Sequence, residues 1–476
     1  MSFYKLGQVQ FDSKKSFPPL TPFNNEWTSF NRMSFDSVRT TIVSTYEETF
    51  PNYEKFYREE KPDLMICDFG SNSCIDSASK HSIPLAIGHQ SLLFWESPSY
   101  FTKLGRIEPS TIDQLSLFKR IKHIIWDQRV KEQGYLPYLR ELNEARKKWG
   151  VPESQYFLAN SNLGLGLVNS FVGFDSPRKL ATHINFIGPV LSDKVQSMSA
   201  ELEEFLNTRE KVLYVGFGSH VFLNSGIQQK LLELFQKLYN EGKIDGLIWG
   251  GLHKTNFDEF PKTYTVNDIE YSTESLVSGE HKNFKLMGWA PQEPVLNHKS
   301  TKLFLSHGGL DSVYESLSAG KPLLILPFFA DQPRNGVLIE ERGIGKVINW
   351  YESSQQEIYM QFEELLNPGN VQLQTKLKQI KQLTDFNSKN KFRVPDVIEN
   401  YIKSAKICRL TSPPKGFEVP CELELLLPIE YTKPEWLLNS WDIYMLLAVS
   451  SLVVGFGVLS KFIRVWYWHC NKVKLD

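Results

Sequence analysis

The chain has 476 residues, of which 41% are hydrophobic and 22% charged, and its formal net charge is −1. This length allows two or three domains, and the near-zero charge gives no sign of a nucleic-acid-binding protein. The five cysteines contain no Cys-x-x-Cys pair, so they indicate neither a zinc site nor a disulfide framework. Cys408 and Cys421 could pair in an oxidising compartment, but the sequence favours free thiols.

The first half of the chain has the pattern of a parallel α/β domain. After a polar and aromatic stretch, a short apolar strand is expected at 64–67, a helix at 73–81 and a second strand at 84–87. This is a β-α-β unit, from which parallel sheets are built. Residues 114–150 are mainly helical by their apolar spacing. The apolar run 186–191, broken by Gly-Pro, ends the domain, and a polar linker follows it.

A second α/β domain is predicted to start at Val212. Strands and helices alternate along it, with strands at 212–216, 246–250, 284–288, 302–306, 322–327 and 345–349, and helices at 226–240, 291–298, 309–319 and 332–343. This order predicts a doubly wound domain, whose ligand binds at the carboxyl ends of the strands. Two further helices are expected at 354–366 and 370–404.

The C-terminus contains a candidate membrane span. Residues 443–460 carry no charge, and as a helix they would extend about 27 Å, close to the hydrocarbon thickness of a bilayer. Tryptophan and tyrosine residues flank the run on both sides, as interfacial aromatics do. The alternative is a buried core helix, but the terminal position and the aromatic flanks favour a span.

The charges around this span predict its orientation. Basic residues follow it, at Lys461, Arg464, Lys472 and Lys474, whereas acidic residues precede it. We therefore expect a cytosolic tail and a lumenal folded part. The last five residues also resemble a dilysine retrieval signal of endoplasmic-reticulum membrane proteins. The first 60 residues contain no signal peptide, so either the topology is reversed or the sequence lacks its natural start.

The turn His307-Gly308-Gly309 lies between a predicted buried strand and a predicted helix. Glycines allow a diphosphate to approach the backbone, and the helix N-terminus offers free N–H groups and a partial positive charge. His307 can add a hydrogen bond or a charge to the leaving group. Asp311, in the first turn of the helix, works against anion binding or is simply a good helix-start residue.

Other polar and aromatic residues lie close to this turn in the sequence. Trp289 either fills the core or stacks on a base, with Gln292 donating to a ribose hydroxyl. Glu315 falls two helical turns after His307, where a carboxylate suits a diol. Asp331 and Gln332 follow a strand and offer groups for sugar hydroxyls. Together these residues predict a nucleotide-sugar site.

The first strand of the second domain is followed by Gly216-Phe-Gly218-Ser219. This segment is similar to a dinucleotide fingerprint, but Val221 replaces its third glycine, and Ser219 fits a phosphate donor better. The chain contains no Asp-x-Asp, so we expect no metal-held diphosphate.

The segment from Trp289 to Asn335 reads WAPQEPVLNHKSTKLFLSHGGLDSVYESLSAGKPLLILPFFADQPRN. This long, ordered pattern resembles the signature region of the UDP-glycosyltransferase family, which includes glucuronosyltransferases of the endoplasmic reticulum. The resemblance covers roughly residues 60–470. It implies an α/β fold with two Rossmann-like domains facing a cleft (GT-B type) and one C-terminal transmembrane helix. The C-terminal domain would hold the UDP-sugar, and the N-terminal domain the acceptor.

The resemblance also assigns donor-binding residues. It implies that Trp289 and Gln292 contact the uridine and Glu315 the ribose. The residues that it assigns to the diphosphate are Ser219, His307, Gly309 and Ser312, and those that it assigns to the sugar are Asp331 and Gln332, with Asn335 completing the donor-binding set. Asp311 departs from the family, which usually has asparagine there.

The family uses a His–Asp dyad, in which the histidine removes the acceptor proton and the aspartate orients it. Asp68, at the end of the predicted strand 64–67, resembles the catalytic aspartate; the alternative is a turn carboxylate. The family's histidine lies upstream, whereas the first histidine here is His81. The family's first strand is also missing. We therefore expect an N-terminally incomplete chain with weak or no transferase activity.

The domain map follows from these patterns. We predict an acceptor-binding domain at 1–191, a UDP-sugar-binding domain at 205–405, a connector at 409–440, a transmembrane helix at 441–463 and a basic tail at 464–476. The predicted function is inverting transfer of a hexose from a UDP-sugar to a hydroxyl of a small lipophilic acceptor, such as a sterol, lipid or phenol. UDP-sugar is then a co-substrate, and no cofactor or metal is expected. The predicted location is the endoplasmic-reticulum membrane, with a single span and a cytosolic tail.

Two alternatives remain open at this stage. A non-catalytic membrane protein could keep the UDP-sugar pocket without the catalytic base. A nicotinamide-dependent oxidoreductase could use Gly216-Phe-Gly218, although the missing third glycine and the 289–335 set disfavour it.

Overall fold

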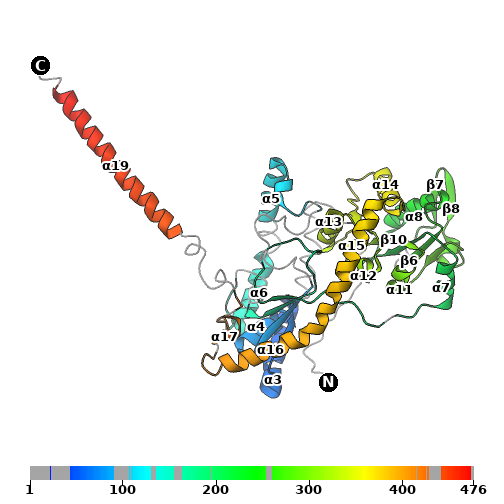
Figure 1. The fold of residues 1–476 in the computed structure, drawn as a ribbon, viewed down its shortest axis with the longest axis horizontal. Coiled ribbons are helices and arrows are strands. Elements are labelled where there is room, and N and C mark those ends of the chain that lie inside the picture. Colours follow the sequence, from blue (N-terminus) through cyan, green and yellow to red (C-terminus); the bar gives the residue numbers. More distant parts are fainter. Residues whose placement is uncertain are drawn as a thin grey trace.

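The computed structural model consists of two α/β domains and a long helix that projects away from them (Figure 1). The structure describes residues 22, 43–90, 107, 109–129, 136–154, 163–178, 180–194, 196–252, 260–413, 415–424, 426–427 and 441–472. The polar and aromatic stretch before position 43, apart from position 22, and the end of the predicted basic tail lie outside these residues.

A parallel sheet of four strands forms the centre of the N-terminal domain, in the order β1-β2-β3-β4. Its strands are β1 Met65–Asp68, β2 Leu85–His89, β3 Leu165–Val168 and β4 Ile184–Phe186. The helices of this domain are α3 Ser44–Glu60, α4 Asn72–Lys80, η3 Ile112–Gln114, α5 Leu117–Arg129 and α6 Leu136–Lys148. The predicted β-α-β unit is therefore present. Sequence reasoning missed β3. The predicted apolar run 186–191 only begins in a strand, because β4 ends at Phe186, before the cis peptide bond between Gly188 and Pro189.

A buried ion pair holds three helices of this domain together. Arg146 of α6 donates from Nε to Asp76 of α4 at 2.7 Å, and neither side chain is exposed. Tyr46 of α3 donates to the same carboxylate at 3.0 Å, and Arg146 also reaches Asn72 at 3.0 Å. Because both charges are satisfied by neighbours, removing either partner would leave an uncompensated buried charge.

A parallel sheet of six strands forms the centre of the C-terminal domain, in the order β12-β11-β10-β5-β6-β9. Its strands are β5 Val212–Gly216, β6 Gly246–Gly250, β9 Phe284–Leu286, β10 Thr301–Ser306, β11 Leu323–Ile325 and β12 Gly345–Val347. The helices are α7 Ala200–Asn207, α8 Ser225–Asn240, α10 Glu274–Val277, α11 Gln292–Asn297, α12 Leu310–Ala319, α13 Gln332–Glu341 and α14 Gln355–Leu366. Each of the six predicted strands is present. The antiparallel hairpin of β7 Thr263–Val266 and β8 Ile269–Ser272 was not predicted.

The helical region predicted as one segment at 370–404 is in fact broken. It consists of α15 Val371–Asn387, the 3₁₀ helix η6 Ser388–Arg393 and α16 Val394–Cys408. Pro395 stands in the first turn of α16, where its missing N–H and fixed φ favour a new helix start. Tyr401 of α16 lies in one buried cluster with Ala86 and Leu165 of the N-terminal sheet. The chain therefore returns to the N-terminal domain after building the C-terminal one.

The expectation of free thiols is wrong for four cysteines. Cys67 at the end of β1 is bonded to Cys74 in α4, and Cys408 of α16 is bonded to Cys421 in the short helix α17 Cys421–Glu424. In each case a turn between two elements brings the cysteines together, with Cα atoms 5.9 and 6.0 Å apart. Spacings of 7 and 13 residues do not reveal such turns in the sequence.

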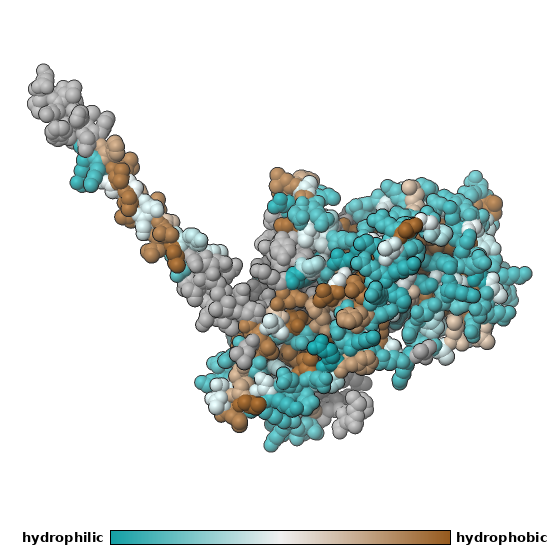
Figure 2. Space-filling model, viewed as in Figure 1, coloured by the Kyte–Doolittle hydropathy of each residue, from teal (hydrophilic) through white to brown (hydrophobic). Residues whose placement is uncertain are grey.

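Helix α19 spans Trp441–Lys472 and includes 24 residues with the length and mean hydropathy (2.1) of a candidate membrane span, Trp441–Arg464. None of its most apolar stretch is buried against the protein, so the buried-core alternative is wrong. In Figure 2 hydrophobic side chains cover much of the projecting helix, whereas the face of the two domains in view is largely hydrophilic. By length and composition this helix is a candidate membrane span.

Candidate functional site

The strand order of the C-terminal sheet places a topological switch point between β5 and β10. From β5 the chain builds outward through β6 and β9, and it then crosses over to continue with β10, β11 and β12 on the other side. Gly216 and Ser306, the last residues of β5 and β10, are register partners. The loops that follow these strands therefore diverge from one point, and such switch points are where doubly wound sheets bind ligands.

The His307 turn lies at this switch point. A Cβ atom on Gly218 would stand 3.0 Å from the His307 ring, and one on Gly309 would lie within 3.0 Å of its Cε1 and closer still to Nε2. The backbone at Gly218 and Gly308 is also left-handed, with φ of 72° and 89°. Gly218 and Gly309 are thus required because a Cβ atom would crowd the His307 ring, and Gly218 and Gly308 because of their left-handed backbone. Ser219 follows this loop and is exposed, whereas Val221, which replaces the third glycine of a dinucleotide fingerprint, is buried in the core.

Burial lowers the pKa of His307 to about 4. The imidazole is therefore neutral at pH 7 in the ligand-free protein. A hydrogen bond, one of the two roles predicted for this side chain, is compatible with that neutral state.

Helix α12 begins directly after this turn, with Gly309 as its N-cap residue. Gln292 of α11 donates from Nε2 to Ser312 at 3.0 Å and to Glu315 at 2.6 Å. Tyr214 of β5 donates to the Gln292 amide oxygen at 3.3 Å. The structure therefore joins three of the predicted donor residues in one hydrogen-bonded group, beside the helix N-terminus.

Trp289 is not a core residue, since 74% of its surface is exposed. It lines a cavity of about 490 Å³ together with Met287 and Pro291. The core-filling interpretation is therefore wrong, and the indole face is available to a flat ligand.

The start of α13 holds the predicted sugar residues. Asn335 donates from Nδ2 to Gly308 O at 2.8 Å and to Asp331 at 2.7 Å, so it ties α13 to the His307 turn. Gln332 is buried, and its amide oxygen accepts from the N–H groups of Phe328 and Phe329 at 2.9 and 3.1 Å. Gln332 thus also shapes the preceding turn, a role that the sequence did not reveal. Burial raises the pKa of Asp331.

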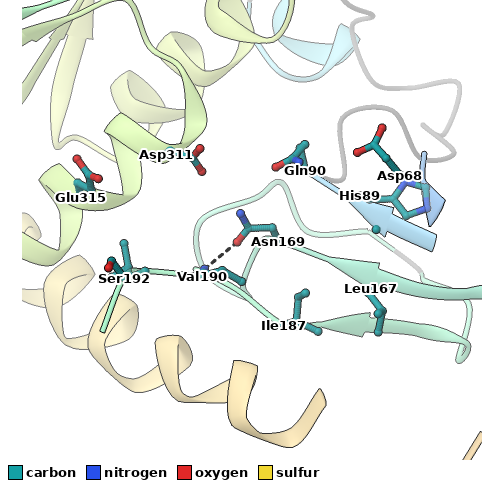
Figure 3. Close-up of a pocket in the computed structure, with 12 residues that line it drawn as sticks. Asp68, His89, Gln90, Leu167, Asn169, Ile187, Val190, Ser192, Asp311 and Glu315 are labelled. Atoms are coloured by element: carbon teal, nitrogen blue, oxygen red, sulfur yellow. Dashed lines mark hydrogen bonds between the residues drawn. The ribbon is translucent and has the colours of Figure 1, made fainter. Parts of the chain in front are cut away.

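A second cavity, of about 500 Å³, lies between the two domains (Figure 3). Asp68, His89 and Gln90 line it from the N-terminal sheet, whereas Asp311 and Glu315 line it from α12. Asp68 is exposed, and its Oδ1 accepts from Gly70 N at 2.9 Å. Burial raises the pKa values of both α12 carboxyls. Acidic groups from both domains thus face one open space.

Sequence reasoning missed His89. Asp68 and Gly88 are register partners, so His89 emerges one residue beyond the position beside Asp68. The sequence did contain a signal for this placement, because Asp68 and His89 each end one of two neighbouring parallel strands. Burial, and to a smaller degree the neighbouring His183, lower the pKa of His89 to about 4.

Comparisons with known proteins agree with this arrangement. The family model described as UDP-glucoronosyl and UDP-glucosyl transferase matches residues 155–379. The chain is 26% identical over 434 residues to a UDP-glycosyltransferase of Talaromyces amestolkiae, covering 87% of this chain and 78% of that protein. It is 25% identical over 446 residues to UDP-glycosyltransferase stmC of Aspergillus ustus, covering 89% and 80%. Over most of its length the chain is therefore similar to UDP-glycosyltransferases.

Solved structures show the fold of this chain. Phytolacca americana UGT2, complexed with UDP-2fluoro-glucose and pterostilbene, aligns with a TM-score of 0.53 at 18% identity, covering 76% of this chain and 82% of that one. The glycotransferase of kitacinnamycin aligns with a TM-score of 0.52 at 19% identity, covering 77% and 83%. The predicted GT-B architecture is confirmed. The match of residues 155–379 to the model of UDP-glucoronosyl and UDP-glucosyl transferases agrees with a protein that uses a UDP-sugar. The oxidoreductase alternative is therefore wrong.

Proposed function

We propose that this chain is an inverting transferase that moves a hexose from a UDP-sugar to a hydroxyl of a small lipophilic acceptor. One observation carries the proposal: the first turns of α12, the helix that begins at the switch point of the C-terminal sheet, and the carboxyl ends of β1 and β2 line one interdomain cavity. A donor held by one domain would face an acceptor held by the other. This arrangement supplies proximity and orientation, which lower the barrier of a two-substrate reaction.

Each donor residue is proposed to contact one part of the UDP-sugar, from the base through the ribose and the diphosphate to the sugar. Trp289 stacks on the uracil, Gln292 contacts the uridine and Glu315 accepts from the ribose hydroxyls. The diphosphate lies over the His307 turn, where Ser219, Ser312 and the free N–H groups at the start of α12 donate to it. Asp331 and Gln332 contact the sugar. We propose that these groups neutralise the leaving UDP without a metal ion.

The acceptor is proposed to enter the interdomain cavity. Leu167, Ile187, Val190 and Leu191 give its N-terminal wall an apolar part, whereas Asp68, His89, Gln90 and Asn169 give it a polar part. An amphipathic molecule with one hydroxyl fits such a wall. The solved neighbours include complexes with pterostilbene and 3,4-dichloroaniline, which are small aromatic compounds.

In the proposed reaction the acceptor oxygen attacks the sugar C1 from the side opposite UDP. The new C1–O bond forms as the bond to the β-phosphate oxygen breaks, so the configuration at C1 inverts and UDP leaves with the electron pair. The hydroxyl proton goes to a base in the cavity, and we propose His89, assisted by Asp68. A pKa of about 4 makes His89 a weak base, so turnover should be slow.

We also propose that the chain is anchored in the endoplasmic-reticulum membrane, with a cytosolic tail and lumenal domains. Two disulfides support a lumenal location, because disulfides persist in oxidising compartments and are rare in the cytosol. The basic residues after the span support the same orientation.

The test is an assay of the purified full chain with several UDP-sugars and with phenolic and sterol acceptors. Formation of a glycoside and UDP in equal amounts, with the opposite anomeric configuration by NMR, is the expected result. A product that retains the donor configuration would contradict the mechanism. UDP binding without any turnover would instead favour the non-catalytic binding protein, for which the low basicity of His89 is the supporting observation.

A further inference from the structure

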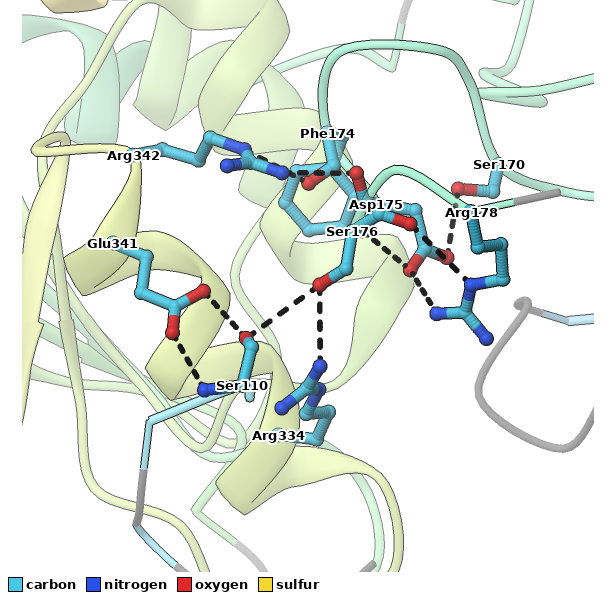
Figure 4. A network of polar contacts seen from close by, with 9 residues as sticks. All are labelled: Ser110, Ser170, Phe174, Asp175, Ser176, Arg178, Arg334, Glu341 and Arg342. Atoms are coloured by element: carbon cyan, nitrogen blue, oxygen red, sulfur yellow. Dashed lines mark hydrogen bonds and ion pairs between the residues drawn. The ribbon is translucent and has the colours of Figure 1, made fainter. Parts of the chain in front are cut away.

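The end of α13 away from the donor site carries a second set of contacts, across the domain boundary (Figure 4). Arg342, the residue that ends this helix, donates from Nε to Phe174 O at 3.1 Å and from Nη2 to Asp175 O at 2.9 Å. At the other end of the helix, Arg334 in its first turn donates to Ser176 at 3.1 Å. These partners all belong to the loop that follows β3 of the N-terminal domain.

A second segment of the N-terminal domain is held by the same helix end. Glu341 accepts from Ser110 through both backbone N–H, at 2.7 Å, and hydroxyl. The hydroxyl of Ser176 in turn lies 3.5 Å from that of Ser110. Two separate segments of the N-terminal domain therefore rest on one end of α13.

The loop after β3, residues 169–178, also receives α12. Tyr314 of α12 donates to Asn169 O at 2.9 Å, and its ring packs edge-on against Phe174 with centroids 5.4 Å apart. Asn169, at the start of this loop, lines the interdomain cavity. The two helices that carry Glu315 and Asp331 thus dock onto one loop, and that loop begins in the acceptor wall.

We propose that loop 169–178 and the C-terminal end of α13 form an interdomain clasp, in which Arg342 is a positioning residue for sugar transfer. Two consecutive carbonyl oxygens held by one guanidinium fix both the position and the orientation of the loop, because the fork geometry of arginine is rigid. The opposite end of the same short helix carries Asp331 and Gln332, about 15 Å away along its axis. The clasp therefore sets how the donor sugar meets the acceptor wall.

The first part of the test, the structural arm, measures the protein structure and does not depend on enzymatic turnover. Hydrogen exchange of the full chain, followed by mass spectrometry, compares wild type with Arg342→Ala. Arg209→Ala is the matched control, because Arg209 also donates to a backbone carbonyl, Phe205 O at 2.8 Å, and to Asn283 at 3.0 Å, but wholly within the C-terminal domain. We expect exchange in loop 169–178 to be about 10-fold faster in Arg342→Ala and unchanged in the control.

Two outcomes of this arm would overturn the clasp. One is unchanged exchange of the loop in Arg342→Ala, and the other is an equal acceleration in Arg209→Ala. If Arg342→Ala does not fold, Arg342→Lys replaces it, since lysine keeps the charge but not the fork. That variant should show faster exchange than wild type, and exchange as slow as wild type would refute the two-carbonyl geometry.

The kinetic arm rests on the proposed function. In Arg342→Ala, kcat should fall about 10-fold while the Kd for UDP stays within about twofold, because the residues proposed to hold UDP are not part of the clasp. A UDP affinity that falls as much as kcat would contradict a positioning role. Absence of turnover in wild type would refute the proposed function alone, since the exchange result would still decide whether the clasp exists.

Discussion

The substitution Gly309→Ala tests the donor site, because it adds one methyl group beside His307. Its Cβ would lie within 3.0 Å of His307 Cε1 and closer still to Nε2, a separation that real Cβ atoms essentially never show. The ring has little room to retreat, because Gly218 lies against it as well. We therefore expect Gly309→Ala to displace the imidazole and lower stability by about 1–3 kcal/mol, the usual cost of overpacking.

The same displacement should weaken UDP binding. A lost hydrogen bond to an ionised phosphate is worth about 1.5–3 kcal/mol, which corresponds to a roughly 10- to 150-fold weaker Kd. The assay is the rise in melting temperature of the full chain on adding UDP. Gly226→Ala in α8 is the control, because its Cβ would meet only Asn224 Oδ1, at 3.6 Å. If Gly309→Ala responded to UDP like wild type, the placement of the diphosphate over the His307 turn would be refuted.

Three further predictions concern pH, metal and membrane. With His89 as a base of pKa about 4, kcat/KM should stay flat from about pH 8 to 5.5 and fall as the pH drops further, whereas an ordinary imidazole would already lose about tenfold at pH 5.5; such an early loss would contradict the assignment. Dialysis against EDTA should leave UDP affinity unchanged, since helix N–H groups and neutral donors are proposed to hold the diphosphate, and a metal-restorable loss would show otherwise. Carbonate extraction of membranes should leave the full chain in the pellet and release a chain ending at Lys433; finding both in the supernatant would remove the membrane claim.

The six-stranded sheet of the C-terminal domain was predictable because most of its strands lie in short apolar runs bounded by turn residues, whereas the β7–β8 hairpin was not predicted. The N-terminal domain was less so. Strand β3 reads Leu-Gly-Leu-Val, and its glycine weakens the β signal, so the neighbours β2 and β4 define it rather than its own sequence. The return of α16 to the N-terminal sheet is a tertiary contact without a local pattern.

Most residues of the proposed donor site could be named from the sequence, because they cluster within 289–335. The contacts that depend on the tertiary structure could not be predicted from the sequence. His89 stands 21 residues after Asp68, and only strand pairing brings them to one cavity. The Cys67–Cys74 pair depends on the turn between β1 and α4. Arg342 contacts Asp175 and Phe174, which lie 167 and 168 positions earlier in the chain. Neither periodicity nor a sequence motif can predict contacts at such a separation.

Calorimetric titration of UDP into the purified full chain and its His307→Ala variant tests the central claim most directly. The claim is that a UDP-sugar binds with its diphosphate over the His307 turn at the switch point of the C-terminal sheet. Wild type should bind one UDP, and the variant should bind about 1–3 kcal/mol more weakly, the scale of a hydrogen bond to a charged group. Equal affinity in the two proteins, or no binding by wild type, would contradict the account.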